Sequence, residues 1–429
     1  MRSTALRWLA ACGSAALLLT GCVANRPVAA TEPSGTASEA TGGALSVTST
    51  AEACQVSAST TTSGNATFLI LNSADKTTEF YLLGEDGLRI VAERENIAPG
   101  ASAELSVALQ PGKYFTACKP GMRGVNVGET EFTVTGEKIE LSGEDQELFD
   151  AAVVDYVNFV KNEVSELAPN VDKLAEAYAS GDDETAKTLF ALTRVNYERI
   201  EPIAEALGVL DPRIDYREID YIAEADALAG DDPTFTEWLG FHRIEKDLWP
   251  PAKDAVQPDG SSAREGWKAS TTDDRQRIAA ALVVDVTKLY DTVHAADFIK
   301  TQKLDIATVS NGASGLLEEI AVGKVTGEED WWSHTDLWDF QANLQGARIA
   351  FDLVAPIAER ESDTGKELVT SIGSEFDKLQ TLLDKYGNLK DGYVSYDKVD
   401  RDQQKELVDQ IDATREPLSK LTNAVLGIK

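Results

Sequence analysis

The sequence predicts a multidomain protein in which an N-terminal all-β Greek-key sandwich precedes an all-α body built as a double helical bundle. Two observations predict this order. Short apolar runs separated by turn residues fill residues 46–136, and a 3.6-residue apolar periodicity takes over across residues 143–429. The length of 429 residues also exceeds what one domain usually needs.

The chain begins with the pattern of a bacterial export signal. Arg2 and Arg7 precede a short apolar run that ends in Leu19-Thr20-Gly21-Cys22, which has the residues of a lipobox. We expect residues 1–21 to be a lipoprotein signal peptide and Cys22 to carry the lipid. Because no later apolar run approaches 18 residues, we expect the mature protein to be lipid-anchored at the outer face of the cytoplasmic membrane.

A flexible tether is expected over residues 22–45, where Ala, Thr, Ser, Gly and Pro dominate. The β body follows over residues 46–136. Turn pairs such as Asp86-Gly87 and Pro111-Gly112 bound its short strands, as is typical of a small Greek-key sandwich. The expected strands are Ala66–Asn72, Glu79–Leu83, Leu88–Ala92, Ala103–Leu109, Gly112–Cys118 and Glu131–Val134.

The helical body is expected over residues 143–429. Long stretches carry apolar residues at helical spacing, and we expect them to pack as two adjoining bundles. These stretches are Asp145–Ala179, Asp183–Leu207, Phe235–Trp249, Asp273–Ile299, Asp336–Arg360, Gly365–Tyr386 and Arg401–Leu426.

The charge balance excludes one class of partner and favours another. There are 72 acidic against 40 basic residues, which gives a net charge of −32. Such a surface repels phosphate, so we expect no nucleic-acid binding, whereas it attracts cations. With only 3 His in the chain, any metal site must rely mainly on oxygen ligands.

Two cysteines remain after Cys12 leaves with the signal and Cys22 is lipidated. Cys54 and Cys118 both lie in the β body, and an oxidising compartment favours a disulfide between them. The alternative is a soft metal site for copper or zinc, formed by the two thiolates with Glu79. A blue-copper centre is excluded, because it needs two His and the β body has none.

The segment around His242 is the most informative. On a helix, Trp238 and Trp249 mark one apolar stripe, and His242 and Glu245 fall on the same stripe. Residues at i and i+3 can touch one ion, and a buried carboxylate needs a partner. The pair is therefore either a chelate for one metal ion or part of a structural ion pair.

Other acidic segments offer further candidates. Glu198 and Glu201 are again three residues apart, and Pro202 removes a backbone donor, which favours a kink at this point. The alternative reading is a solvated acidic helix face. Two more acidic stretches are Asp211–Glu218 and Gly327–Phe340, the second of which leads into a helix with Thr335 as N-cap.

Several enzyme signatures are missing from the sequence. There is no H-E-x-x-H, no Gly-rich phosphate loop and no G-x-S-x-G elbow. We expect His294, which has only Asp291 and Asp297 at helical spacing, to be structural.

Four runs of the sequence resemble the EfeO family, the extracytoplasmic components of EfeUOB-type bacterial iron uptake systems. The runs are Glu93–Gly100, Tyr197–Glu205, Gly240–Lys246 and Ser333–Asn343. The resemblance covers about residues 50–427. It implies a cupredoxin-like N-terminal domain and an imelysin-like helical domain of a family once classed with peptidases.

The resemblance also implies site residues and partners. The family's metal site maps to His242 and Glu245 of the H-x-x-E motif, with Glu198, Glu201, Asp215 and Glu329. A second site maps to Cys54, Glu79 and Cys118. The implied cargo is iron, as Fe²⁺ or Fe³⁺, and the implied partners are an EfeU-like membrane permease and an EfeB-like haem-peroxidase-like protein.

A donor set of several carboxylates and one imidazole is hard and oxygen-rich, which favours iron, manganese or calcium. We therefore expect an iron-binding transport component that is not an enzyme, whose affinity falls at low pH. One alternative is a metallopeptidase with Glu198 or Glu201 as general base. Another is a copper-assisted ferroxidase that uses Cys54 and Cys118.

Overall fold

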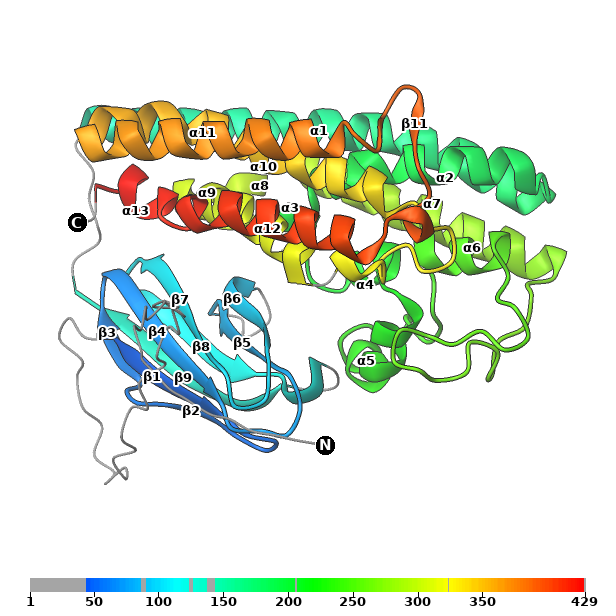
Figure 1. Cartoon of the computed structure of the whole chain (residues 1–429), viewed down its shortest axis with the longest axis horizontal. Helices are drawn as coiled ribbons and strands as arrows, with labels where there is room; N and C mark the ends of the chain where they lie inside the picture. Colours follow the sequence, from blue (N-terminus) through cyan, green and yellow to red (C-terminus); the bar gives the residue numbers. More distant parts are fainter. Residues whose placement is uncertain are drawn as a thin grey trace, which may run out of the picture. The chain divides into compact units, whose positions relative to one another are not determined.

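The computed structural model describes residues 44–85, 90–122, 126–136, 143–204, 207–322 and 324–427. The expected signal peptide, Cys22 and nearly all of the tether lie outside these residues. Within them, a β body is followed by a helical body, in the order that the sequence predicts (Figure 1). No described helix combines the length and apolarity needed to cross a membrane.

Two sheets form the β body. Their strand orders are β2-β1-β4-β7 and β3-β9-β8-β5-β6. The strands are β1 Leu45–Ser49, β2 Cys54–Val56, β3 Thr60–Thr62, β4 Gly64–Asn72, β5 Thr78–Leu83, β6 Ile90–Ile97, β7 Ser102–Leu109, β8 Gly112–Cys118 and β9 Val127–Thr135. The expected strands did not include β1, β2 and β3, which are only three to five residues long.

Alternating burial places one face of each sheet in a shared core. Along β4, Phe68 and Ile70 are buried while Leu69 is exposed, as the two-residue repeat of a strand requires. The Phe68 ring lies 5.2 Å from that of Phe80 and 5.6 Å from that of Phe132, measured between centroids. These contacts join the two sheets.

The structure confirms the disulfide alternative for the two cysteines of the β body. Cys54 on β2 and Cys118 on β8 are bonded to each other, which consumes both thiolates that a copper or zinc site would need. Glu79 does not lie with them. Phe80 pairs with Cys118, and side chains alternate along a strand, so Glu79 points to the opposite face of β5. There its carboxylate accepts a hydrogen bond from the Tyr81 hydroxyl.

The described helices share one hydrophobic core rather than the two that separate bundles would give. The long helices α1, α10 and α11 run along a common direction (Figure 1). The helices are α1 Gly143–Ser180, α2 Asp183–Glu198, α3 Glu201–Ala204, α4 Leu210–Asp215, α5 Glu218–Asp231, α6 Phe241–Leu248, α7 Thr272–His294, α8 Phe298–Thr301, α9 Ile306–Val322, α10 Asp336–Glu361, α11 Asp363–Leu383, α12 Arg401–Leu418 and α13 Leu421–Val425. A small hairpin joins α11 to α12, formed by β10 Gly387–Asn388 and β11 Gly392–Tyr393.

Two interruptions of the expected helices position the candidate site. The helix expected over Asp183–Leu207 breaks before Pro202, so that α2 ends at Glu198 and α3 begins at Glu201. The helix expected over Phe235–Trp249 was too long, because it begins only at Phe241. Gly240 has φ 88°, and its Cα lies against the Ile214 carbonyl with no room for a side chain. Trp238 is therefore not on the helix that carries His242.

Candidate metal site

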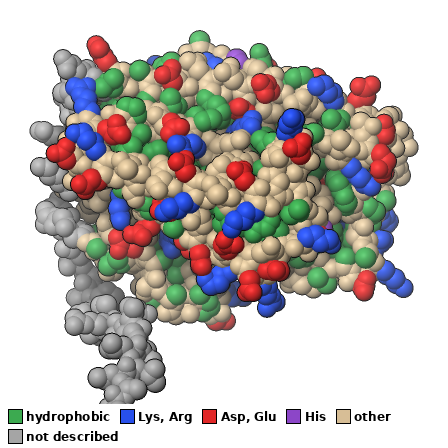
Figure 2. All heavy atoms as spheres, turned by 45° about the horizontal axis from the view of Figure 1, so that its top comes forward, with side chains coloured by type: hydrophobic (Ala, Val, Ile, Leu, Met, Phe, Trp, Pro, Cys, Tyr) green, Lys and Arg blue, Asp and Glu red, His purple; other side chains and the backbone are tan. Residues whose placement is uncertain are grey.

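The six residues proposed as ligands lie close together in the helical body, and each is at most 8 % exposed. This clustering of acidic groups in the interior contrasts with the face shown in Figure 2, where acidic and basic side chains are interspersed. The six residues come from the end of α2 (Glu198), the start of α3 (Glu201), the end of α4 (Asp215), α6 (His242 and Glu245) and the segment before α10 (Glu329).

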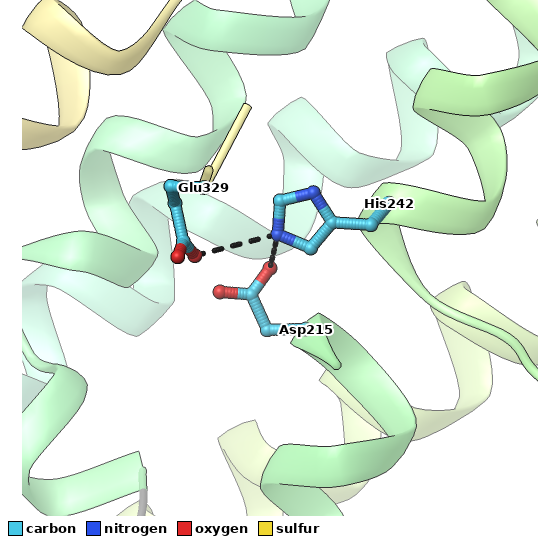
Figure 3. Close-up of side chains that lie close together, drawn as sticks. All are labelled: Asp215, His242 and Glu329. Carbon is cyan, nitrogen blue, oxygen red and sulfur yellow. Dashed lines mark ion pairs between the residues drawn. The ribbon is translucent and has the colours of Figure 1, made fainter. Parts of the chain in front are cut away.

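One nitrogen of the imidazole faces two carboxylates. His242 Nε2 lies 3.5 Å from Asp215 Oδ1 and 3.4 Å from Glu329 Oε1 (Figure 3). It has no hydrogen-bond partner among the residues that the structure describes. Charge-assisted hydrogen bonds are about 2.7–2.9 Å long, so these gaps are wide for direct pairing. The three groups are close enough together to hold one ion.

The other imidazole nitrogen is held by Glu245. His242 Nδ1 lies 3.0 Å from Glu245 Oε2. The second carboxylate oxygen, Oε1, accepts hydrogen bonds from the Trp332 N–H at 3.0 Å, the Ser333 N–H at 2.8 Å and the Ser333 hydroxyl at 2.8 Å. Both oxygens of Glu245 are thus engaged. A carboxylate in this position fixes the orientation of the imidazole and directs Nε2 toward Asp215 and Glu329.

Two buried cations that the sequence analysis missed lie among these carboxylates. Arg194 is fully buried and bonds to Glu198 and Asp215. Lys324 is 4 % exposed and donates to Glu198 at 2.9 Å and to Glu201 at 2.7 Å. Arg194 lies one helical turn before Glu198, so this pair could have been found from its i, i+4 spacing. Lys324 is more than 120 residues away in sequence, and no local pattern indicates its place.

Three further carboxyl groups were also missed. Asp330, Asp336 and Asp339 are fully buried. Among the described residues, neither oxygen of Asp339 has a hydrogen-bond partner, and one oxygen each of Asp330 and Asp336 also lacks one. All three belong to the acidic stretch Gly327–Phe340, which the sequence analysis singled out without assigning them. Asp336 and Asp339 flank the buried Leu337, and this spacing was the available sign that they face inward.

Burial dominates the acid–base behaviour of these groups. It raises the pKa of Asp215 to about 7, although Arg194 and His242 act against the shift. It likewise raises the pKa of Asp330 to about 6 and the pKa of Asp339 well above its usual range. Asp339 therefore keeps its proton near neutral pH when no metal is present, and Asp215 keeps its proton in part.

The pKa values of Glu329 and His242 shift in the directions expected for an ion pair. Burial opposes ionisation of Glu329, but Lys324 and His242 together hold the pKa of its carboxyl well below the usual range. Burial and Arg194 disfavour a charged imidazole, yet the hydrogen bond to Glu245 and the nearby carboxylates of Glu329 and Asp215 raise the pKa of His242 to about 10. A metal ion bound at Nε2 would therefore take the place of a proton.

The space next to these groups is small. A cavity of about 10 Å³ is lined by His242, Glu245 and Glu329 together with Trp331 and Trp332 and other side chains. This volume suits about one water molecule or one bare ion.

The segment that carries Trp331 and Trp332 is held in place at several points. It begins at Gly327 and ends at His334, which have φ angles of 76° and 57°. Its Trp332 ring lies 5.0 Å from the ammonium of Lys246, which the Trp238 and Trp267 rings also approach within 6.0 Å. The remaining histidine, His294, stacks on Tyr290 at 4.0 Å, away from the site residues.

Comparisons with known proteins agree with one another. The model of the imelysin family, peptidase family M75, matches residues 152–421, which include all the site residues. The chain is 36 % identical over 386 residues to the iron uptake system component EfeO of Escherichia coli K12 and to that of Shigella flexneri. Each alignment covers 90 % of this chain and 92 % of the relative.

Proposed function

Because the chain belongs to the imelysin family, and within it to the EfeO iron uptake components, we propose that it binds iron outside the cytoplasm and delivers it to a membrane permease. The observation that carries the proposal is His242 Nε2, which is buried, lacks a hydrogen bond among the described residues and faces Asp215 and Glu329. Metal–ligand bonds of about 2 Å to all three groups would fill the present gaps.

The chemistry of the donors supports iron as the cargo. One imidazole with several carboxylates is a hard donor set, which suits Fe²⁺ and Fe³⁺ better than soft ions such as Cu⁺. A divalent or trivalent ion would also offset the excess of buried carboxyl groups over buried cations at this site. In the proposal, His242, Asp215 and Glu329 are the direct ligands, Glu245 orients the imidazole, and Glu198 and Glu201 complete the acidic surroundings.

The remaining parts of the proposal concern attachment and partners. Lipidation of Cys22 would hold the protein at the outer face of the cytoplasmic membrane. The partners would be an EfeU-like permease and an EfeB-like haem-peroxidase-like protein. We interpret the two-sheet β body as a Greek-key, cupredoxin-like domain, and its disulfide gives it no thiolate for copper or zinc.

Iron titration by calorimetry under anaerobic conditions tests the proposal. The His242→Ala variant should lose at least about a hundredfold in affinity for Fe²⁺, because it removes the nitrogen ligand. The His294→Ala variant is the matched control, since that ring contacts Tyr290 and Ser165 rather than the site. Equal iron binding by His242→Ala and the wild type would refute the proposed site.

The family name keeps a metallopeptidase as the second candidate. Hydrolysis needs a metal-bound water and room for a peptide beside it. The cavity of about 10 Å³ gives no such room in this conformation. Metal-dependent cleavage of a peptide library, lost in His242→Ala, would support this candidate over transport alone.

A further inference from the structure

Lys324 places a cation of the chain itself among the acidic groups of the site. Its ammonium donates to Glu198 Oε2 at 2.9 Å and to both oxygens of Glu201, at 2.8 and 2.7 Å. Glu198 is fully buried and Glu201 is 8 % exposed, so water screens these contacts little. The ammonium therefore occupies a position that a metal ion would also favour.

The same two carboxylates belong to a group that can hold one ion. Glu198, Glu201, Asp215 and Glu329 offer oxygens that all lie within 4.8 Å of one another. A metal ion that used Glu198 or Glu201 would share their lone pairs with Lys324 Nζ. The two positive charges would then lie only a few ångströms apart in an interior of low polarity, where their repulsion is strong.

The head group of Lys324 is freer to move than that of Arg194. Arg194 is enclosed, with its guanidinium about 6 Å from the rings of Phe190 and Phe241 and bonded to Glu198 and Asp215. Lys324 carries a compact charge on a flexible four-carbon stem. It begins a single 3₁₀ turn, Lys324–Thr326, rather than a long helix. Of the two cations, Lys324 is the one whose head group can move aside when an ion enters.

We propose that Lys324 is an internal competitor for iron, whose ammonium neutralises Glu198 and Glu201 in the empty site and thereby limits affinity and speeds release. This inference rests on the proposed function and adds a residue that tunes it. A carrier must give up its cargo, and buried carboxylates left without a cation are strongly unfavourable. An ammonium tethered beside them supplies the replacement charge at once.

A purely structural salt bridge predicts the opposite effect of removing the charge. If Lys324 only held the two glutamates in place, its loss would disorder them and weaken iron binding. Asn343 bears on this distinction, because its amide donates to Glu198 Oε2 and to Glu201 Oε2, each at 3.0 Å. These bonds should keep both carboxylates in place after the ammonium is removed, so the sign of the change separates the two roles.

The test compares the full-length wild type with Lys324→Met, which keeps the length of the stem without the charge. Fe²⁺ affinity is measured by anaerobic calorimetry, and release to an excess of chelator by stopped-flow absorbance. We expect Lys324→Met to bind at least about tenfold tighter and to release iron correspondingly more slowly, because one competing charge is gone. Lys324→Arg, which keeps the charge, should stay close to the wild type.

The controls make each outcome decisive. Lys366→Met removes a surface lysine paired with Asp363 and should leave affinity and release unchanged. Lys324→Gln is the second neutral variant, for use if Lys324→Met fails to fold by circular dichroism, and it should also bind more tightly. Unchanged or weaker binding in a folded neutral variant overturns the inference while the proposed function stands. Absence of iron binding by the wild type overturns both.

Discussion

Replacement of Glu245 by Gln should weaken iron binding without removing a direct ligand. The present carboxylate accepts from His242 Nδ1 with one oxygen and from Trp332 and Ser333 with the other. Gln can keep the contacts to the turn through its carbonyl oxygen. Its NH₂ group would then face Nδ1, which must give up its proton to accept a hydrogen bond.

The magnitude follows from this switch of the imidazole proton. The remaining proton of a neutral His242 would move to Nε2, the atom that faces Asp215 and Glu329. Changes to groups that orient a metal-bound histidine typically cost 10–100-fold in affinity, which is about 1.4–2.8 kcal/mol. The free energy of unfolding should change less, because the three donors at Trp332 and Ser333 keep an acceptor oxygen in both proteins.

Calorimetric iron titration gives the affinity, and ¹⁵N NMR of the imidazole gives the protonation state. In the metal-free variant the pKa of His242 should fall below its present value of about 10, because the charged acceptor is lost. Glu237→Gln, at an exposed pair with Arg277, is the control and should match the wild type. Wild-type affinity together with unchanged imidazole signals in Glu245→Gln would refute the orienting role.

Three other predictions concern stability and the position of α6. Burial raises the pKa of Asp211 from 3.8 to about 6, so the native state holds a proton that the unfolded chain has lost, and stability should fall as pH rises from about 4 to 6. Asp211→Asn should remove up to about 3 kcal/mol of this fall, measured by urea unfolding of metal-free protein across that range. Replacement of Cys54 and Cys118 by Ser should cost the β body about 4 kcal/mol, given the 64-residue separation, and leave iron affinity unchanged. Gly240→Ala should cost at least about 2 kcal/mol and weaken iron binding, because the new methyl group meets the Ile214 carbonyl at a positive φ and displaces α6.

Each of these predictions has an outcome that contradicts it. An unchanged pH profile in Asp211→Asn would show that this carboxyl group titrates normally in the folded protein. Loss of iron binding on removal of the disulfide would show that the metal site depends on the β body. Wild-type stability of Gly240→Ala would mean that α6 can start without the close contact to Ile214.

The parts of the site that could be predicted from the sequence are those with a local pattern. The spacing of His242 and Glu245 marks a pair on one helix, and Pro202 marks the break between α2 and α3, at which Glu198 and Glu201 lie. In a chain with 72 acidic residues, however, a buried aspartate looks like a solvated one. The only local sign that Asp339 is buried is its place near Leu337 on α10, and such a spacing also occurs on solvated helix faces.

The same limit explains the errors in the fold. Apolar periodicity continues from Phe235 to Trp249, so the sequence gives no reason to start the helix at Phe241. The start is set by the approach of Gly240 to a carbonyl group of α4, which is a contact between separate segments. The count of cysteines and the expected compartment favoured the disulfide but left a metal site open, and the structure shows the bond.

The position of Trp331 and Trp332 beside the candidate ligands has a consequence for the fluorescence of the protein. Trp331 and Trp332 border the same small cavity as His242 and Glu329, and Trp332 follows Glu329 by only three residues. An iron ion among those ligands would lie close enough to quench indole emission, whereas a diamagnetic, colourless ion such as Ga³⁺ would not quench in the same way. If iron binds as proposed, loading should therefore be measurable as a partial loss of tryptophan emission from the purified protein, without any attached label.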